Sequence, residues 1–105
     1  MTNTLTNLDA IALIGDQGSH VIIPDQYETI GADSFRGTQL TSVVIPNSVT
    51  SIEAQAFADT QLTSIDIPAS VTEIGEGAFR GAQLTSAEIP DSLTEIGHFA
   101  FTTPN

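Results

Sequence analysis

A repeat of 22 residues constrains this chain more than any other feature of its sequence. One proline, one phenylalanine and one isoleucine recur at that interval. The three columns are Pro24, Pro46, Pro68 and Pro90; Phe35, Phe57, Phe79 and Phe101; and Ile30, Ile52, Ile74 and Ile96. Self-similarity at a fixed period of this length indicates an architecture of stacked units, each packed mainly on its neighbours.

The repeat defines the domain organisation. Four full units span residues 17–38, 39–60, 61–82 and 83–104. Residues 1–16 resemble the second half of a unit when they are shifted by one period, which places Leu5 on Tyr27 and Leu8 on Ile30. We therefore predict a single domain over residues 1–105 that begins with an N-terminal half repeat.

The two halves of each unit have different hydrophobic periods. In residues 62–68, Ile65 and Ile67 alternate with polar residues, which predicts a short strand with one side in the core. Proline ends that strand because it cannot donate to a ladder. Residues 71–79 place apolar residues at spacings of three, four and one, which predicts a turn followed by about one turn of helix.

The units have to stack, because one unit cannot bury its own apolar side. Stacking places equivalent strands ~4.8 Å apart, so we predict an α/β solenoid with a four-stranded parallel sheet. Seven columns should fill its interior. Two of them are the columns of Ile30 and Phe35 given above. The other five are Ile23, Ile45, Ile67 and Ile89; Gly18, Leu40, Leu62 and Leu84; Val21, Val43, Ile65 and Ala87; Tyr27, Val49, Val71 and Leu93; and Ser34, Ala56, Ala78 and Ala100.

Composition excludes several classes of function. Thirteen acidic residues against two basic ones give a formal charge of −11, which disfavours nucleic acid and anionic membranes as partners. The chain has no cysteine, no phosphate-binding loop and no metal-ligand spacing, so we predict no cofactor and no metal. The first 30 residues lack a basic region followed by an apolar core, which predicts a cytoplasmic protein; export by a route without such a signal is the alternative.

The repeated string Leu-Thr-Ser-x-x-Ile-Pro-x-Ser-Val-Thr-x-Ile-Gly-x-x-Ala-Phe resembles the BspA-like leucine-rich repeats of bacteria and some protists. The resemblance runs from about Leu5 to Phe101. It implies a right-handed leucine-rich-repeat solenoid with its sheet on the concave face, and a non-enzymatic module for adhesion and protein binding. Where that family usually has a cysteine after the Ala-Phe pair, this chain has Thr38, Thr60 and Ala82.

The outward positions of the predicted sheet are candidates for partner contact. One column changes from Ile22 and Val44 to Asp66 and Glu88, and His20 lies two residues before Ile22. An apolar area beside an acidic one suits a protein ligand, and drift between repeats is the alternative explanation. We expect Asp66 and Glu88 to form a solvated acidic patch and not a calcium site, which needs six to eight oxygens. The pair Glu73 and Glu95 receives the same interpretation.

Two further surface features bear on chemistry. Ser42 is expected beside His20, but no aspartate is expected near enough to orient the ring, so we predict no enzyme activity. The in-register threonines Thr41, Thr63 and Thr85 resemble ice-binding or carbohydrate-binding faces, but hydroxyl bonds between neighbouring strands are the preferred explanation.

The ends of the stack are candidates for self-association. The sheet is expected to have open edges at residues 19–23 and 85–89, and open edges template pairing. Phe99 stands where the other units have Asp33, Gln55 and Gly77, close to Phe101. It suggests contact with a second chain, with a fold-back cap as the alternative, and a two-fold homodimer is the simplest closed assembly.

Overall fold

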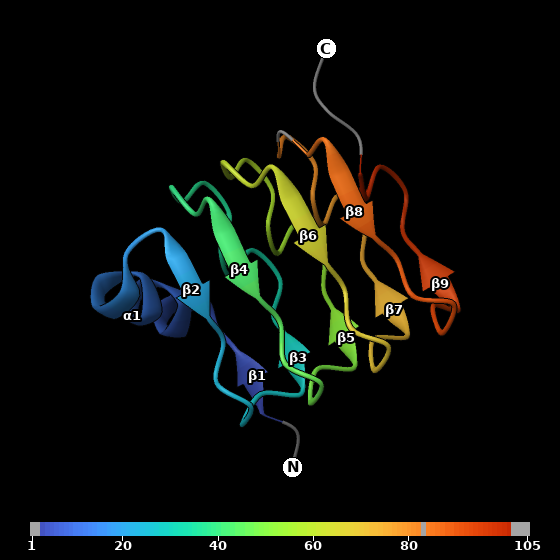
Figure 1. Cartoon of the computed structure of the whole chain (residues 1–105), viewed down its shortest axis with the longest axis horizontal. Helices are drawn as coiled ribbons and strands as arrows, with labels where there is room; N and C mark the ends of the chain where they lie inside the picture. The colour runs from blue at the N-terminus through green and yellow to red at the C-terminus, as the bar shows by residue number, and fades with distance from the viewer. Residues whose placement is uncertain (1–2, 83, 102–105) are drawn as a thin grey trace.

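Each repeat unit contributes two short strands, and the strands form two rows along the stack (Figure 1). The computed structural model describes residues 3–82 and 84–101. One row holds the three-residue strands β2 (His20–Ile22), β4 (Ser42–Val44), β6 (Ser64–Asp66) and β8 (Ser86–Glu88). The other holds the two-residue strands β1 (Thr4–Leu5), β3 (Thr29–Ile30), β5 (Ser51–Ile52), β7 (Glu73–Ile74) and β9 (Glu95–Ile96). A helix, α1 (Asn7–Gln17), lies at the N-terminal end of the stack.

The three-residue strands confirm the predicted parallel pairing but not a single four-stranded sheet. They form two ladders, β2 with β4 and β6 with β8, each in the register of the 22-residue repeat. Strands β4 and β6 are neighbours without forming a ladder. Strands of three residues share only a few ladder bonds, so a small separation between two units is enough to interrupt the sheet.

The second half of each unit differs from the predicted turn of helix. It begins with a strand of the parallel sheet β1-β3-β5-β7-β9, in which Ile30, Ile52 and Ile74 are aligned. A run of turns follows each strand, at residues 32–37 in the first full unit. In that run the Ser34 and Arg36 N–H groups bond within the unit, whereas the Asp33 and Phe35 N–H groups donate to carbonyls of the next unit.

This alternation prevents a helix, which would need every N–H to bond within its own segment. It also requires a left-handed backbone at the same position of each unit. Asp33, Gln55, Gly77 and Phe99 have φ values of 60°, 58°, 63° and 62°.

Residues 7–17 correct the prediction for the N-terminus. They form an α-helix whose first turn is held by a capping box between Thr6 and Asp9. The helix packs Ala10, Leu13 and Ile14 against the core, at helical spacing. Leu5 pairs with Ile30, so the sequence alignment that placed it on Tyr27 was three residues out of register.

The inward columns form one continuous core, as predicted. Phe35, Phe57, Phe79 and Phe101 stack in a ladder with ring centroids 5.2–5.3 Å apart. The exceptions lie at the ends of the stack, where Gly18 ends α1 in an exposed position and Ala87 is exposed. Ile89 and Ile96 are 47% and 51% exposed because no further described unit packs on them.

Within the described part of the chain, α1 is the one helix and is 11 residues long, and no helix there has the length and apolarity to cross a membrane.

Candidate partner-binding surface

The pairing of β2 with β4 and of β6 with β8 brings together the side chains predicted to contact a partner. We define the long-strand face as the outward residues His20, Ile22, Val44, Asp66 and Glu88. Ile22 lies beside Val44 in one ladder, and Asp66 lies beside Glu88 in the other. The two aliphatic side chains are 63% and 57% exposed. The face therefore presents an apolar pair at one end and a carboxylate pair at the other.

His20 and Ser42 meet on this face, as predicted. The His20 Nδ1 and the Ser42 Oγ are 2.6 Å apart, and both side chains reach solvent. A serine nucleophile needs a base and a third group that fixes the ring of that base. Among the residues that the structure describes, no hydrogen bond joins the His20 ring to a carboxylate, so the pair is best explained as a surface contact.

One predicted open edge is covered. The Gln17 side chain donates to the Ile22 carbonyl at 3.1 Å and accepts from the Ile22 N–H at 2.9 Å. These two bonds occupy the N–H and carbonyl groups of Ile22, which a further strand on this edge would need. The edge of β2 is therefore covered at Ile22 by the last residue of α1.

The threonine ladders have a structural role in the described residues. Thr41 Oγ1 donates to the Ser19 carbonyl, and Thr85 Oγ1 donates to the Thr63 carbonyl, each at 3.2 Å. On the other row, Thr94 Oγ1 donates to the Thr72 carbonyl at 3.0 Å. Each bond joins one unit to the unit before it. The hydroxyl hydrogens of these three threonines are thus engaged between repeats, where they join neighbouring units.

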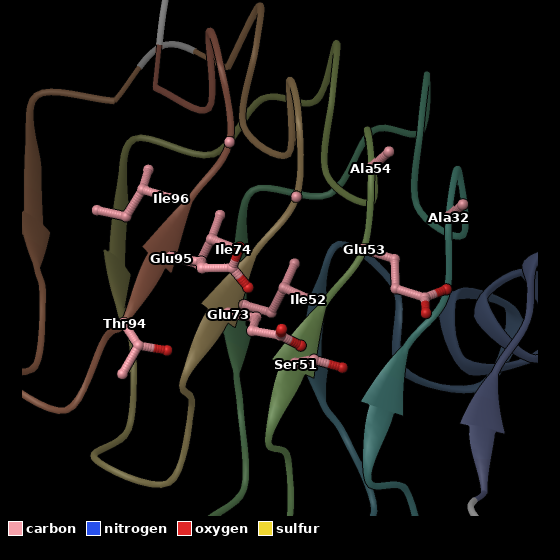
Figure 2. A pocket seen from close by; sticks show the side chains of 12 residues that line it. Ala32, Ser51, Ile52, Glu53, Ala54, Glu73, Ile74, Thr94, Glu95 and Ile96 are labelled. Carbon is pink, nitrogen blue, oxygen red and sulfur yellow. The ribbon is translucent and has the colours of Figure 1, made fainter.

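A groove that the sequence did not predict crosses the two-residue strands β5, β7 and β9 (Figure 2). Its volume is about 780 Å³, and Glu53, Glu73 and Glu95 line it. The buried Ile52 and Ile74 and the half-exposed Ile96 also line it. A hydrogen bond to Glu95, the like charge of that group and slight desolvation raise the pKa of Glu73. The signal that could have located the groove is Glu53, which stands where other units have Gly31, Gly75 and Gly97.

The groove is acidic but does not form a recognisable metal centre. In residues 3–82 and 84–101, no group of three or more His, Asp or Glu side chains is arranged to hold a metal ion. The two arginines of the chain line a separate pocket of about 300 Å³ on the turn runs, next to Asp59. Nothing cationic therefore lines the groove.

The two residues predicted to associate with another chain have different surroundings. Phe101 is half-buried and stacks on Phe79, so it is the last member of the ring ladder. Phe99 projects from the stack and is 58% exposed. The Arg80 guanidinium carbon lies 5.8 Å from the centre of the Phe99 ring, which is cation–π geometry.

Comparison with known proteins agrees with this architecture. The crystal structure titled "Pneumococcal vaccine antigen PcpA" matches with a TM-score of 0.71 and 28% sequence identity. The match covers 79% of this chain and 22% of that one, so this chain spans about a fifth of its length. No curated protein matches the sequence.

The family described as "BspA type Leucine rich repeat region (6 copies)" matches residues 6–105. Members of such a repeat family are generally binding modules and not enzymes. The strand pairing, the inward columns and this match agree, and the chain belongs to the BspA-type leucine-rich repeat family.

Proposed function

We propose that this protein is a non-enzymatic binding module and that the long-strand face is where it contacts a protein partner. The exposed pair of Ile22 and Val44 carries the proposal. Two neighbouring aliphatic side chains, more than half exposed on a rigid ladder, provide an apolar centre that a partner can desolvate. Asp66 and Glu88 extend that centre with negative charge, which favours a partner with a basic rim.

The repeat family supports binding as the general role, while the identity of the surface rests on exposure and register. Every strand of the long-strand row is held by pairing to a neighbour, so the outward side chains are presented in fixed positions. A preorganised surface loses little entropy on association. The threonine ladders are not part of this proposal because their hydroxyls bond between repeats.

The test begins with a photo-reactive amino acid at Val44, used to cross-link partners in a lysate of the source organism. The protein so identified is then purified, and its affinity is measured by calorimetry against the double variant Val44→Arg with Asp66→Arg. We expect at least about a tenfold loss of affinity, the effect of removing a contact at the centre of an interface.

The matched control is Asp25→Arg with Ala69→Arg, which changes the net charge equally at two exposed positions in the bends after β2 and β6. The control should keep the affinity of the wild type. Equal affinities for all three proteins would reject the long-strand face as the contact surface.

A further inference from the structure

The two basic residues of the chain occupy the same position of two alternate units. Arg36 and Arg80 each follow a phenylalanine of the ring ladder, and Ala58 holds that position in the unit between them. Neighbouring rings of that ladder are 5.2–5.3 Å apart, so the backbones of the two arginines are separated by two such steps. Because Ala58 has no long side chain, a space remains between the two arginine side chains.

That space is the pocket of about 300 Å³ on the turn runs, which we call the arginine pocket. Its lining residues are Arg36, Gln55, Ala58, Asp59 and Arg80. Ala58 is 3% exposed and lies at the base of the pocket. The lining residues belong to units that have described neighbours on both sides, so the pocket does not depend on either end of the chain.

The charges of the arginine pocket suit a ligand with a single negative charge. Two guanidinium groups and the carboxylate of Asp59 give its lining a net charge of +1, in a chain whose formal charge is −11. The acidic groove, by contrast, is lined by three glutamates and by no cation. Exposed charges more than about 8–10 Å away are largely screened at physiological ionic strength, so a ligand in the pocket interacts mainly with the lining.

The two arginines differ in the carboxylates that they already contact. The Arg36 Nη1 lies 3.4 Å from the Oδ1 of Asp33, three residues earlier, and its Nε lies 3.9 Å from the Oδ2 of Asp59. The residue three positions before Arg80 is Gly77, which has no carboxylate to offer. Among the residues that the structure describes, Arg80 forms no ion pair. Its guanidinium donors therefore have no carboxylate partner in that part of the chain.

We propose that the arginine pocket binds one carboxylate group between Arg36 and Arg80. A planar guanidinium presents a fork of N–H donors that matches the two oxygens of a carboxylate, and the side-chain amide of Gln55 offers a further donor. An exposed ion pair such as that of Arg36 with Asp59 contributes little stability, so a ligand can displace Asp59 from Arg36. A small acid and an acidic side chain of a partner both supply this chemical group.

The chain allows a direct spectroscopic test, because Arg36 and Arg80 are its only arginines. A nitrogen–proton correlation spectrum shows one Nε–H signal for each, and the variants Arg36→Lys and Arg80→Lys assign them. Sodium acetate is titrated into the full chain, with sodium chloride at equal ionic strength as the control. We expect saturable shifts of both signals, with a dissociation constant of about 1–10 mM for a ligand of so few atoms. Shifts that do not saturate, or that chloride reproduces, would overturn the proposal.

Two variants should change the affinity for acetate in opposite directions. Arg80→Gln removes one of the two guanidinium groups and should weaken binding, followed at the Arg36 signal, by about tenfold. Asp59→Asn removes the competing carboxylate with little change of shape and should strengthen binding several-fold. Damage to the fold does not tighten binding, so this gain separates the site from a structural effect. An Asp59→Asn protein with equal or weaker affinity would contradict the proposal.

The matched control is Asn47→Asp, which lowers the net charge by one, as Arg80→Gln does, at an exposed position in the bend after β4. Aspartate suits that position because Asp25 and Asp91 hold the equivalent ones. This variant should bind acetate like the wild type. Ala58→Gln fills the pocket without a change of charge, at a position that holds arginine in the units on either side, and should abolish binding. Acetate that still binds to the Ala58→Gln protein would lie elsewhere, and the proposal would be wrong.

Peptides identify the source of the carboxylate. The probe is a blocked tripeptide with glutamate between two glycines, and its control has glutamine in place of glutamate. Tighter binding of the glutamate peptide than of acetate assigns an acidic side chain of a partner, whereas weaker binding assigns a small acid, and both results support the pocket. A glutamine peptide that binds as tightly as the glutamate peptide, or inorganic phosphate that binds more tightly than acetate, would reject the carboxylate assignment. The proposed function is tested at Val44 and Asp66, outside this pocket, so failure of one proposal leaves the other intact.

Discussion

The rings of Phe57 and Phe79 lie 5.3 Å apart, centroid to centroid, with their planes only 4° from parallel. Phe35 stacks on the other side of Phe57 at 5.2 Å, so Phe57 is enclosed by rings of both neighbouring units. Phe57 and Phe79 thus each contribute to two interfaces between repeats, and the centre of the ladder is the most sensitive point of the stack.

Replacing Phe57 with alanine should therefore lower the free energy of unfolding by about 3–5 kcal/mol, because a cavity remains between two rings. Urea denaturation followed by circular dichroism measures the change. Leu8→Ala, at a side chain that is 78% exposed, is the control and should stay within about 0.5 kcal/mol of the wild type. A loss below about 1 kcal/mol for Phe57→Ala would contradict a rigid ring ladder.

Two glycine-to-alanine changes should have opposite signs. A Cβ at Gly75 would lie 2.5 Å from the Ala54 nitrogen and 2.7 Å from the Glu53 carbonyl carbon, and backbone cannot move aside cheaply. Gly75→Ala should cost about 1–3 kcal/mol of stability. Gly15 lies in α1 with nothing within 4 Å of an added Cβ, so Gly15→Ala should gain about 0.5–1 kcal/mol. Thermal unfolding of the two variants measures both changes. A Gly75→Ala protein as stable as the wild type would refute the close approach at Gly75.

Ser34 is the polar member of a column that is otherwise Ala56, Ala78 and Ala100. Its side chain is fully buried, and its Oγ has no hydrogen-bond partner in the part of the chain that the structure describes. Ser34→Ala should therefore stabilise the protein by about 1 kcal/mol, since the desolvation cost of the hydroxyl disappears. Ser64→Ala, at an exposed serine, should give no such gain in chemical denaturation. A destabilised Ser34→Ala protein would show that this hydroxyl has a partner.

The capping box of α1 makes a separate prediction for the covered end of the stack. Thr6→Ala removes the hydroxyl that accepts from the Asp9 N–H, and it should cost about 1 kcal/mol. Thr6→Ser keeps that oxygen and should retain most of the stability. Hydrogen exchange of the α1 amides reports the change locally, and equal protection in both variants would argue against the cap.

The raised pKa of Glu73 predicts a pH dependence of stability. The folded chain holds the Glu73 proton more tightly than the unfolded chain does. The protonated Glu73 therefore contributes to the free energy of unfolding below pH about 4.5, and this contribution is lost as the pH rises through the pKa of the folded state. Glu73→Gln should flatten that part of the profile and raise stability at neutral pH. Glu28→Gln is the control, because it removes one exposed charge at the residue directly before β3. Unfolding midpoints at a series of pH values make the comparison, and parallel profiles for wild type and Glu73→Gln would exclude the Glu73–Glu95 interaction as the cause.

Much of the candidate surface could be predicted from the sequence. The period of 22 residues places His20 beside Ser42, Ile22 beside Val44 and Asp66 beside Glu88, and the strands of the structure pair in the same register. Alternation within residues 62–68 is enough to say which side of the strand is buried, because successive side chains of a strand point to opposite faces. The N-terminal helix was also within reach of the sequence, since Thr6 and Asp9 have capping-box spacing before an apolar run.

The tertiary structure decided what the local pattern could not. Residues 32–37 form a run of turns and not a helix because the Asp33 and Phe35 N–H groups bond to the next unit. The conformation of this segment therefore depends on the neighbouring unit. The same dependence produces the five-stranded second sheet and the acidic groove across it. It also exposes Ile89 and Ile96, which have the same sequence environment as their buried equivalents but no described unit beyond them. The sequence alone determined the repeat and its inward columns, because these follow from periodicity; contacts between units, which are not local, determined the rest.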